Sequence, residues 1–313
     1  MFAEEGYVAL TEGAAVVRRG DRAVLSITGP DRLTWLQGLV TNDVLSLPVG
    51  GICDAAYLTP QGRMITDLRV VNFADRTVLD VPAPLSQSLH SRLEALLFSE
   101  DAEIKDQSRQ VSIVDVHGPL APTVTAGLSM VRDDAYGMPG YSAFIASGAV
   151  NEWVHQLVDK GAVETTLETL DVVRVEAGRP AFLVDMDEHT IPLEAGLEDR
   201  AISFTKGCYV GQEVIVRVMH RGGGRVAKRL VGFHLGKAEL PSAHAAVTSA
   251  GKNIGRLTSI AWSPSLGEAI ALGYVHRGFT TPGTAVHIAG KSGPIAAHVA
   301  ALPFIQRQTA SAP

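Results

Sequence analysis

The sequence predicts an α+β protein in which helices and strands alternate first and strands alone follow. Two observations carry this prediction. Between residues 22 and 177 the apolar positions switch repeatedly between strand and helix spacing. After residue 225 short strand-like runs follow one another, separated by Gly and Pro, and no long helix is evident. A run of three glycines at 222–224 suggests a boundary there, giving units of 1–225 and 226–313.

The composition limits what this chain of 313 residues can be. Apolar residues make up 46% and charged residues 19%, and mean hydropathy is +0.15, which excludes intrinsic disorder. No run approaches the roughly 18 apolar residues of a membrane span, so we expect no direct membrane contact. The net charge of −6 argues against an overall nucleic-acid-binding surface. The first residues resemble neither a secretory signal nor a transit peptide, so a cytoplasmic location is expected.

Local patterns predict the individual elements. A strand at 22–28 should lead into a helix capped by Asp31, with Leu33, Leu36, Leu39 and Val40 on its buried side. The turn at 59–62 joins two strands, 55–58 and 65–73, in a hairpin. The remaining expected elements are strands at 78–81 and 111–116, helices at 85–97, 151–160 (capped by Asn151) and 166–177, and late strands at 209–218, 230–235, 285–288 and 295–300.

The most unusual string is KGCYVGQE at 206–213. It places the thiol of Cys208 two residues after Lys206, at the mouth of the expected strand. A nearby ammonium favours the thiolate, which is the nucleophilic form. The alternative is a half-buried structural cysteine beside a surface lysine, because free cysteine often serves as a small hydrophobe. The two glycines of the string indicate a tight turn or a close approach of another segment.

Metal binding finds little support in the sequence. The cysteines, Cys53 and Cys208, lie far apart, no CxxC occurs, and the histidines lack zinc-ligand spacing. A four-cysteine iron–sulfur site within one chain is excluded, although a shared cluster using one thiol is not. The acidic stretch 185–190 matches no loop for a hard cation, so we interpret it as a solvated loop.

Two carboxylates stand in unusual places. Asp67 lies inside an otherwise apolar strand pattern, and Glu176 lies at the end of a helix, where the macrodipole disfavours negative charge. A carboxylate facing a cavity could hold a flat, amino-substituted heterocycle through paired N–H···O bonds. The alternative is an exposed strand aspartate and a surface glutamate.

The stretch 214–238 contains no Asp or Glu and six Lys or Arg residues, from Arg217 to Lys237. It could attract a polyanion, including a nucleic acid, or it could be ordinary solvated charge. No phosphate-binding loop, dinucleotide fingerprint, nucleophile elbow or HExxH motif is present.

Several strings together resemble the glycine-cleavage T-protein superfamily (GcvT, aminomethyltransferase). They are ITGPD at 27–31, TPQGR at 59–63, RVEAG at 174–178 and DEHTIPLEAGL at 187–197. KGCYVGQE is typical of the YgfZ branch of that superfamily. The resemblance implies a ring of three domains of GcvT/YgfZ type, with a ferredoxin-like middle part and a small C-terminal β-barrel. Residues 1–225 would then hold the first two domains, interleaved along the chain with a boundary near 50–115.

The resemblance also implies a ligand, tetrahydrofolate or a derivative, bound in the central hole. Asp67 matches a catalytic aspartate near folate N10, Glu176 matches a residue that holds the pterin, and Arg200 is the nearest match to a folate-contacting arginine. Lys206 and Cys208 match the YgfZ string, whose cysteine is functional. The candidate site residues are therefore Cys208, Lys206 and Asp67 for catalysis and Glu176, Asp67 and Arg200 for folate, with no metal.

Two functions follow from this resemblance. The leading one is a folate-binding accessory protein for assembly or repair of iron–sulfur clusters in client enzymes such as tRNA methylthiotransferases. The alternative is a folate-dependent aminomethyltransferase of the glycine cleavage system. The T-protein ends in an aromatic-containing tail that contributes to folate binding, whereas residues 303–309 here contain no Tyr, which counts against aminomethyl transfer.

Overall fold

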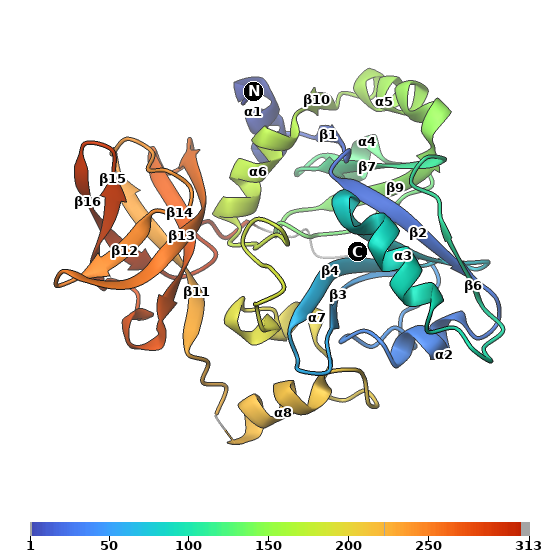
Figure 1. The fold of residues 1–313 in the computed structure, drawn as a ribbon. Coiled ribbons are helices and arrows are strands. Elements are labelled where there is room, and N and C mark those ends of the chain that lie inside the picture. The colour runs from blue at the N-terminus through green and yellow to red at the C-terminus, as the bar shows by residue number, and fades with distance from the viewer. Residues whose placement is uncertain (1, 222, 308–313) are drawn as a thin grey trace.

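A computed structural model describes residues 2–221 and 223–307. Figure 1 shows two sheets on one side and a barrel on the other. One sheet has the strand order β3-β4-β5-β2-β6, and the second has the order β10-β1-β7-β9-β8. The third part is a closed barrel of six strands, β11-β14-β13-β12-β15-β16. The expected α+β fold with a C-terminal barrel is confirmed.

The first sheet is antiparallel and carries its helices on one face. Leu25 and Ile27 from the sheet pack against Leu36 of α2 and Leu89 and Leu93 of α3. The predicted hairpin is confirmed, since Ala56 of β3 pairs with Asp67 of β4. The elements are β2 (Arg22–Thr28), α2 (Arg32–Gln37), β3 (Ile52–Leu58), β4 (Met64–Asn72), β5 (Thr77–Pro82), α3 (Ser86–Glu94) and β6 (Glu103–Asp106).

The second sheet is built from chain on both sides of the first. Its strand β1 precedes the whole first sheet and its other four strands follow, so the two units interleave along the chain. The strands β1 and β10 pair in parallel, and the other pairs are antiparallel. The elements are α1 (Glu4–Glu12), β1 (Ala15–Arg18), β7 (Val111–His117), α4 (Ala121–Val124), β8 (Val131–Arg132), β9 (Gly140–Ala146), α5 (Val150–Asp159), β10 (Val163–Thr165) and α6 (Leu167–Glu176).

The barrel encloses its own core. Phe233, Val247, Leu257 and Ile288 point inward from four different strands and are buried. Its strands are β11 (Lys228–Gly236), β12 (Ala246–Ser249), β13 (Lys252–Ser263), β14 (Glu268–His276), β15 (Ala285–Gly290) and β16 (Gly293–Ala300). Between α6 and the barrel lie the short helix α7 (Glu198–Ala201) and the longer helix α8 (Gln212–Arg221).

The strand predicted at 209–218 is wrong, because most of it forms α8. The alternating valines of this segment imitate a strand pattern. The packing follows helical spacing instead: Ile215, Val218 and Met219 meet one cluster that also contains Leu58 and Met64. Cys208 therefore lies on a loop before a helix and not at the mouth of a strand.

Two predicted caps are also wrong in detail. The helix α5 starts one residue earlier than expected, so Asn151 lies inside it and its side chain accepts a hydrogen bond from Arg18 at 2.7 Å. Asp31 precedes α2, but its carboxylate accepts from the backbone N–H of Asp101 and makes no cap bond. In both cases the side chain accepts a hydrogen bond from a residue that is distant in sequence and does not cap its helix.

The acidic stretch 185–190 is not wholly a solvated loop. Asp185 is buried and pairs with Arg174 at 2.7 Å, and it also accepts hydrogen bonds from Thr258 and Ser259 of β13. This carboxylate thus fastens α6 to the barrel. None of the helices within residues 2–221 and 223–307 is long and apolar enough to cross a membrane.

Candidate functional site

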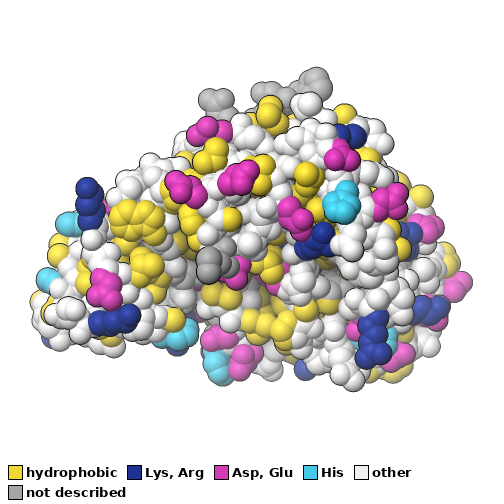
Figure 2. All heavy atoms as spheres, turned by 90° about the horizontal axis from the view of Figure 1, so that it is seen from above, with side chains coloured by type: hydrophobic (Ala, Val, Ile, Leu, Met, Phe, Trp, Pro, Cys, Tyr) yellow, Lys and Arg dark blue, Asp and Glu magenta, His cyan; other side chains and the backbone are white. Residues whose placement is uncertain are grey.

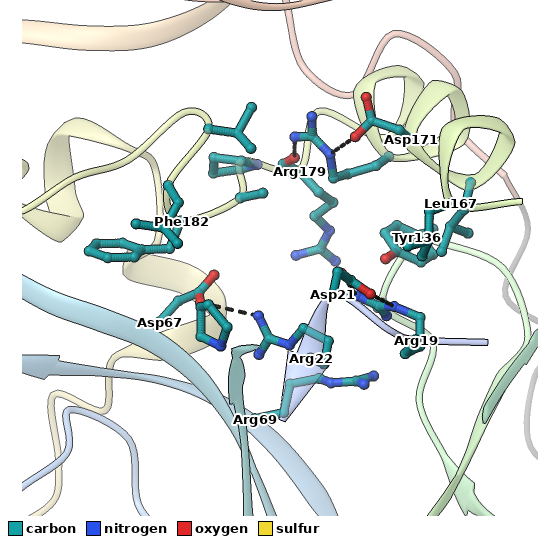
Figure 3. Close-up of a pocket in the computed structure, with 18 of the residues that line it drawn as sticks. Arg19, Asp21, Arg22, Asp67, Arg69, Tyr136, Leu167, Asp171, Arg179 and Phe182 are labelled. Atoms are coloured by element: carbon teal, nitrogen blue, oxygen red, sulfur yellow. Dashed lines mark hydrogen bonds and ion pairs between the residues drawn. The ribbon is translucent and has the colours of Figure 1, made fainter. Parts of the chain in front are cut away.

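A cavity of about 1070 Å³ is lined by strands of the first sheet, by residues that flank strands of the second sheet, by α6 and by the barrel strand β13. Figure 3 shows charged side chains entering it from several elements. The apolar lining includes Leu170, Phe182 and Trp262. A volume of this size accommodates a ligand of several rings, and a mostly apolar wall with a few polar groups is typical of small-molecule sites.

Asp67 of β4 lines this cavity. Its Oδ1 atom is buried and accepts no hydrogen bond from the described residues, while the guanidinium of Arg22 lies 3.5 Å from it. Buried carboxylate oxygens are normally hydrogen-bonded. The guanidinium of Arg22 is the charged group nearest to that enclosed oxygen. The side chain as a whole is 24% exposed, so a bound molecule could donate an N–H to the other carboxylate oxygen.

Arg22 is held in place by a second carboxylate, Asp80. The Nε atom of Arg22 donates to Asp80 Oδ1 at 2.6 Å, and Arg69 Nε donates to Asp80 Oδ2 at 2.6 Å. Asp80 is completely buried in β5, between β4 and β2. The three side chains thus cross the first sheet from strand to strand and fix the orientation of Arg22 toward Asp67.

The same arrangement continues into the second sheet through Asp115 of β7. Asp115 is fully buried and accepts from Arg19 and from Ser142, each at 2.6 Å, while Arg69 lies 3.6 Å from it. Burial alone would raise the pKa of Asp115, but Arg69 and Arg19 outweigh that effect and hold the pKa well below its ordinary value. We call Arg19, Arg22, Arg69, Asp80 and Asp115 the inter-sheet charge network.

Replacing Asp115 with Asn should destabilise the protein by about 3 kcal/mol at pH 7, because two buried guanidinium groups lose a charged partner. The folded-state pKa is depressed, so the wild type loses this contribution as the pH falls below the unfolded value of about 3.9. The difference in the free energy of unfolding between wild type and Asp115→Asn, measured with urea, should therefore become smaller as the pH falls from 5 to 3.

The matched control is Asp75→Asn, which removes an exposed carboxylate paired with Arg76 at 3.0 Å. Such surface pairs contribute about 0–1 kcal/mol. An equal loss of stability in both variants, or a gap that widens in acid, would show that Asp115 does not support the fold as described.

Glu176 does not line this cavity. It is fully buried at the end of α6, and its carboxylate accepts hydrogen bonds from Tyr7 at 2.6 Å, from Ser263 and from Arg307. These donors come from α1, the barrel and the chain after the barrel, so Glu176 joins three distant segments. Its assignment to a pterin stays a prediction, and these three bonds account for the carboxylate at an unfavourable helix end.

Lys206 points away from the cavity as well. Its ammonium donates to the carbonyl oxygens of Gln37, Val40 and Asn42 at 2.7–2.8 Å, which lie at and beyond the end of α2. Burial lowers the pKa of Lys206 to about 8, so at neutral pH it remains mostly protonated and can donate to all three carbonyls. The lysine fastens the 206–213 segment to the end of α2 and the chain that follows it.

Gly211 is a second residue of the 206–213 segment with a structural role. Its φ of +83° favours glycine, and a Cβ there would lie 2.6 Å from the carbonyl oxygen of Thr59 in the β3–β4 turn. Glycine therefore allows the segment to touch that turn. With Lys206 and Gly211 in these structural roles, Cys208 is left exposed on the loop between them.

The two thiols should differ sharply in reactivity. Cys208 is exposed, whereas Cys53 is only partly accessible and burial, with Asp54 adding to it, raises the pKa of its thiol to about 12. A disulfide reagent that reacts with thiols should therefore modify Cys208 rapidly in the native protein at pH 8, and Cys53 only slowly. Cys208→Ser should abolish the rapid phase and Cys53→Ser should preserve it; the reverse pattern would contradict the placement of both residues.

Arg200 lines the cavity and pairs with Asp54 at 3.3 Å. Of the predicted site residues, the structure thus brings Asp67 and Arg200 to one cavity and leaves Glu176, Lys206 and Cys208 outside its lining. A cluster of three His, Cys, Asp or Glu side chains suited to a metal does not occur among the described residues.

The basic stretch 214–238 is divided between α8 and β11. Several of its cations have acidic partners: Arg217 pairs with Glu213, Lys228 with Glu194 and Arg229 with Glu198. The side chain of Arg221 and residue 222 lie outside the described part. Figure 2 shows the side of the molecule away from α8, and on that face positive and negative side chains are also interspersed. A nucleic-acid partner for this stretch stays a prediction.

The sequence analysis missed the inter-sheet charge network and Arg179, which also lines the cavity. A signal for the network was available. Asp80 and Asp115 each interrupt an apolar strand, as Asp67 does. A charge at such a position is retained only with a partner, so buried arginines could have been expected nearby.

The fold and cavity define a class of three-part proteins that enclose a small-molecule site. The family described as "GCVT N-terminal domain" matches residues 4–143, and the "Glycine cleavage T-protein C-terminal barrel domain" matches residues 228–306. Together these matches cover more than two thirds of the chain. The chain belongs to the glycine-cleavage T-protein superfamily.

Individual relatives agree with this assignment. An aminomethyltransferase of Halothermothrix orenii is 26% identical over 89% of this chain and 85% of its own. One from Rubrobacter xylanophilus is 28% identical over 91% of this chain and 81% of its own. The glycine cleavage aminomethyltransferase T of Bartonella henselae has a solved structure that matches with a TM-score of 0.88, over 97% of this chain and 90% of that one; at 20% identity this shows the shared fold.

Proposed function

We propose that this protein binds a tetrahydrofolate in the cavity and transfers an aminomethyl carbon to it. The observation that carries the proposal is the partly exposed carboxylate of Asp67 at the wall of a cavity of suitable volume. The names of the relatives support the reaction class, since the bacterial proteins just described are aminomethyltransferases.

The chemistry matches the groups present. A tetrahydrofolate offers N–H donors on its pterin ring system and on the adjoining amine, and the carboxylate of Asp67 supplies an acceptor, with Arg22 beside one of its two oxygens. Joining the methylene carbon of an S-aminomethyl group to two folate nitrogens breaks its C–S and C–N bonds, and the departing thiol and ammonia take up the two protons that the folate nitrogens lose. A carboxylate within hydrogen-bond reach of one of these nitrogens can accept its proton and pass it to the leaving group. Arg22, held by Asp80, fixes the carboxylate in one orientation.

A second candidate function rests on a separate observation. Cys208 is exposed on a segment whose Lys206 and Gly211 have structural roles, so the loop presents a thiol at the surface. This fits an accessory protein that binds folate and supports iron–sulfur clusters in client enzymes, as the YgfZ-like string implies. The aminomethyl transfer proposal assigns no step to this thiol.

Replacing Asp67 with Asn should lower the formation of methylene-tetrahydrofolate from an aminomethylated lipoyl carrier protein by about 10²–10⁴-fold, because the base is lost while the side-chain shape is kept. Tetrahydrofolate affinity, measured by calorimetry, should change much less than the rate. Asp75→Asn is the matched surface control. Full activity in Asp67→Asn, or absence of turnover in the wild type, would contradict aminomethyl transfer.

The Cys208→Ser variant separates the two functions. Under the aminomethyl transfer proposal it should retain the wild-type rate and should leave iron–sulfur enzyme activities in cells unchanged. A fall in those activities, with folate affinity intact, would favour the accessory function instead.

A further inference from the structure

Arg179 brings a positive charge into the cavity from the chain that follows α6. Its backbone is held on both sides by Arg174: the N–H of Arg179 donates to the carbonyl oxygen of Arg174 at 3.0 Å, and the guanidinium of Arg174 donates to the carbonyl oxygen of Arg179 at 2.6 Å. Arg174 is itself buried and paired with Asp185. In Figure 3 the side chain of Arg179 extends from this base into open space, with Asp67 on one side and Tyr136 on the other. The guanidinium therefore has a fixed origin and faces the interior of the cavity.

The guanidinium of Arg179 has no partner in the protein. It forms no hydrogen bond or ion pair with any residue in the described ranges 2–221 and 223–307. Three other arginines that line the cavity each pair with a carboxylate, and these are Arg19, Arg22 and Arg200. Burial lowers the pKa of Arg179, and the positive charge of Arg200 lowers it further. A half-buried cation of this kind would be stabilised by a negative charge on a bound molecule.

Aminomethyl transfer creates such a negative charge at one atom of the substrate. A folate nitrogen forms its bond to the methylene carbon, the C–S bond breaks, and the electron pair of that bond stays on the sulfur of the carrier. The sulfur is then a thiolate until it receives the proton that the folate nitrogen has given to Asp67. Ammonia leaves from the same carbon when the second folate nitrogen bonds to it, and ammonia takes up the second proton. A cation fixed beside a developing anion is one of the largest single contributions to catalysis.

We propose that Arg179 is a catalytic group that stabilises the thiolate leaving group of the carrier protein. The inference rests on the proposed function and assigns the group that acts on its second substrate. In a displacement at carbon, the attacking nitrogen and the departing sulfur lie on opposite sides of the carbon. With the nitrogen at Asp67, the sulfur lies toward the space that Arg179 enters (Figure 3). The two charged side chains thus act on the bond that forms and on the bond that breaks.

The reverse reaction tests this role, because the sulfur must then attack as a thiolate. Methylene-tetrahydrofolate, ammonia and the reduced lipoyl carrier protein are converted to the aminomethylated carrier, and the initial rate is measured from pH 7 to pH 9.5. A neighbouring cation favours the thiolate, so Arg179→Gln should be about 10- to 100-fold slower than wild type at pH 7. The ratio of the two rates should fall toward one at pH 9.5, where hydroxide also ionises the thiol in the variant. Arg179→Lys should retain part of the rate because the charge remains.

Arg76→Gln is the control, because Arg76 lies outside the cavity lining and pairs with Asp75 at the surface. Arg179 has no intramolecular partner, so Arg179→Gln should unfold at the wild-type temperature and should bind tetrahydrofolate, measured by calorimetry, with wild-type affinity. A rate ratio that does not change with pH, or a loss of rate that comes only from weaker folate binding, would overturn the assignment while the proposed function stands. If the wild type catalyses the reaction in neither direction, the proposed function itself fails.

Discussion

The inter-sheet charge network is the constraint on which the geometry of the cavity depends. Buried charges are retained in proteins when each has an opposite partner, and removing one partner leaves the other uncompensated. Asp80 and Asp115 are fully buried on different sheets, and Arg69 lies close to both. The two sheets are therefore fixed relative to each other where they face the cavity. Arg22 donates a hydrogen bond to Asp80 and also pairs with Asp67, so the position of Asp67 depends on the same network.

Much of the fold could be predicted from periodicity, because most elements bury one face. The β3–β4 hairpin, α3 and the barrel strands follow that rule. The helix α8 could not be recognised from spacing, since its valines alternate like a strand and only its contacts with Leu58 and Met64 decide between the two structures. The interleaving of the two sheets depends on the pairing of β1 with β7 and β10, which joins segments far apart in sequence.

The candidate site was predictable only in part. Asp67 and Glu176 both stand out in the sequence as carboxylates in unusual places, and in the structure neither is an exposed surface residue. The sequence does not show that Asp67 faces a cavity whereas Glu176 is enclosed by hydrogen-bond donors. Those donors, Tyr7, Ser263 and Arg307, come from three segments that are distant in sequence. Likewise, the sequence marks 206–213 as unusual but does not show that Lys206 is directed at α2.

A crystal structure of the complex with tetrahydrofolate tests the account most directly. The central claim is that one cavity, held open between the two sheets, presents the Asp67 carboxylate to a bound folate. The account predicts a folate nitrogen within hydrogen-bond distance of a carboxylate oxygen of Asp67. A folate bound outside this cavity, or bound within it away from Asp67, would contradict the account.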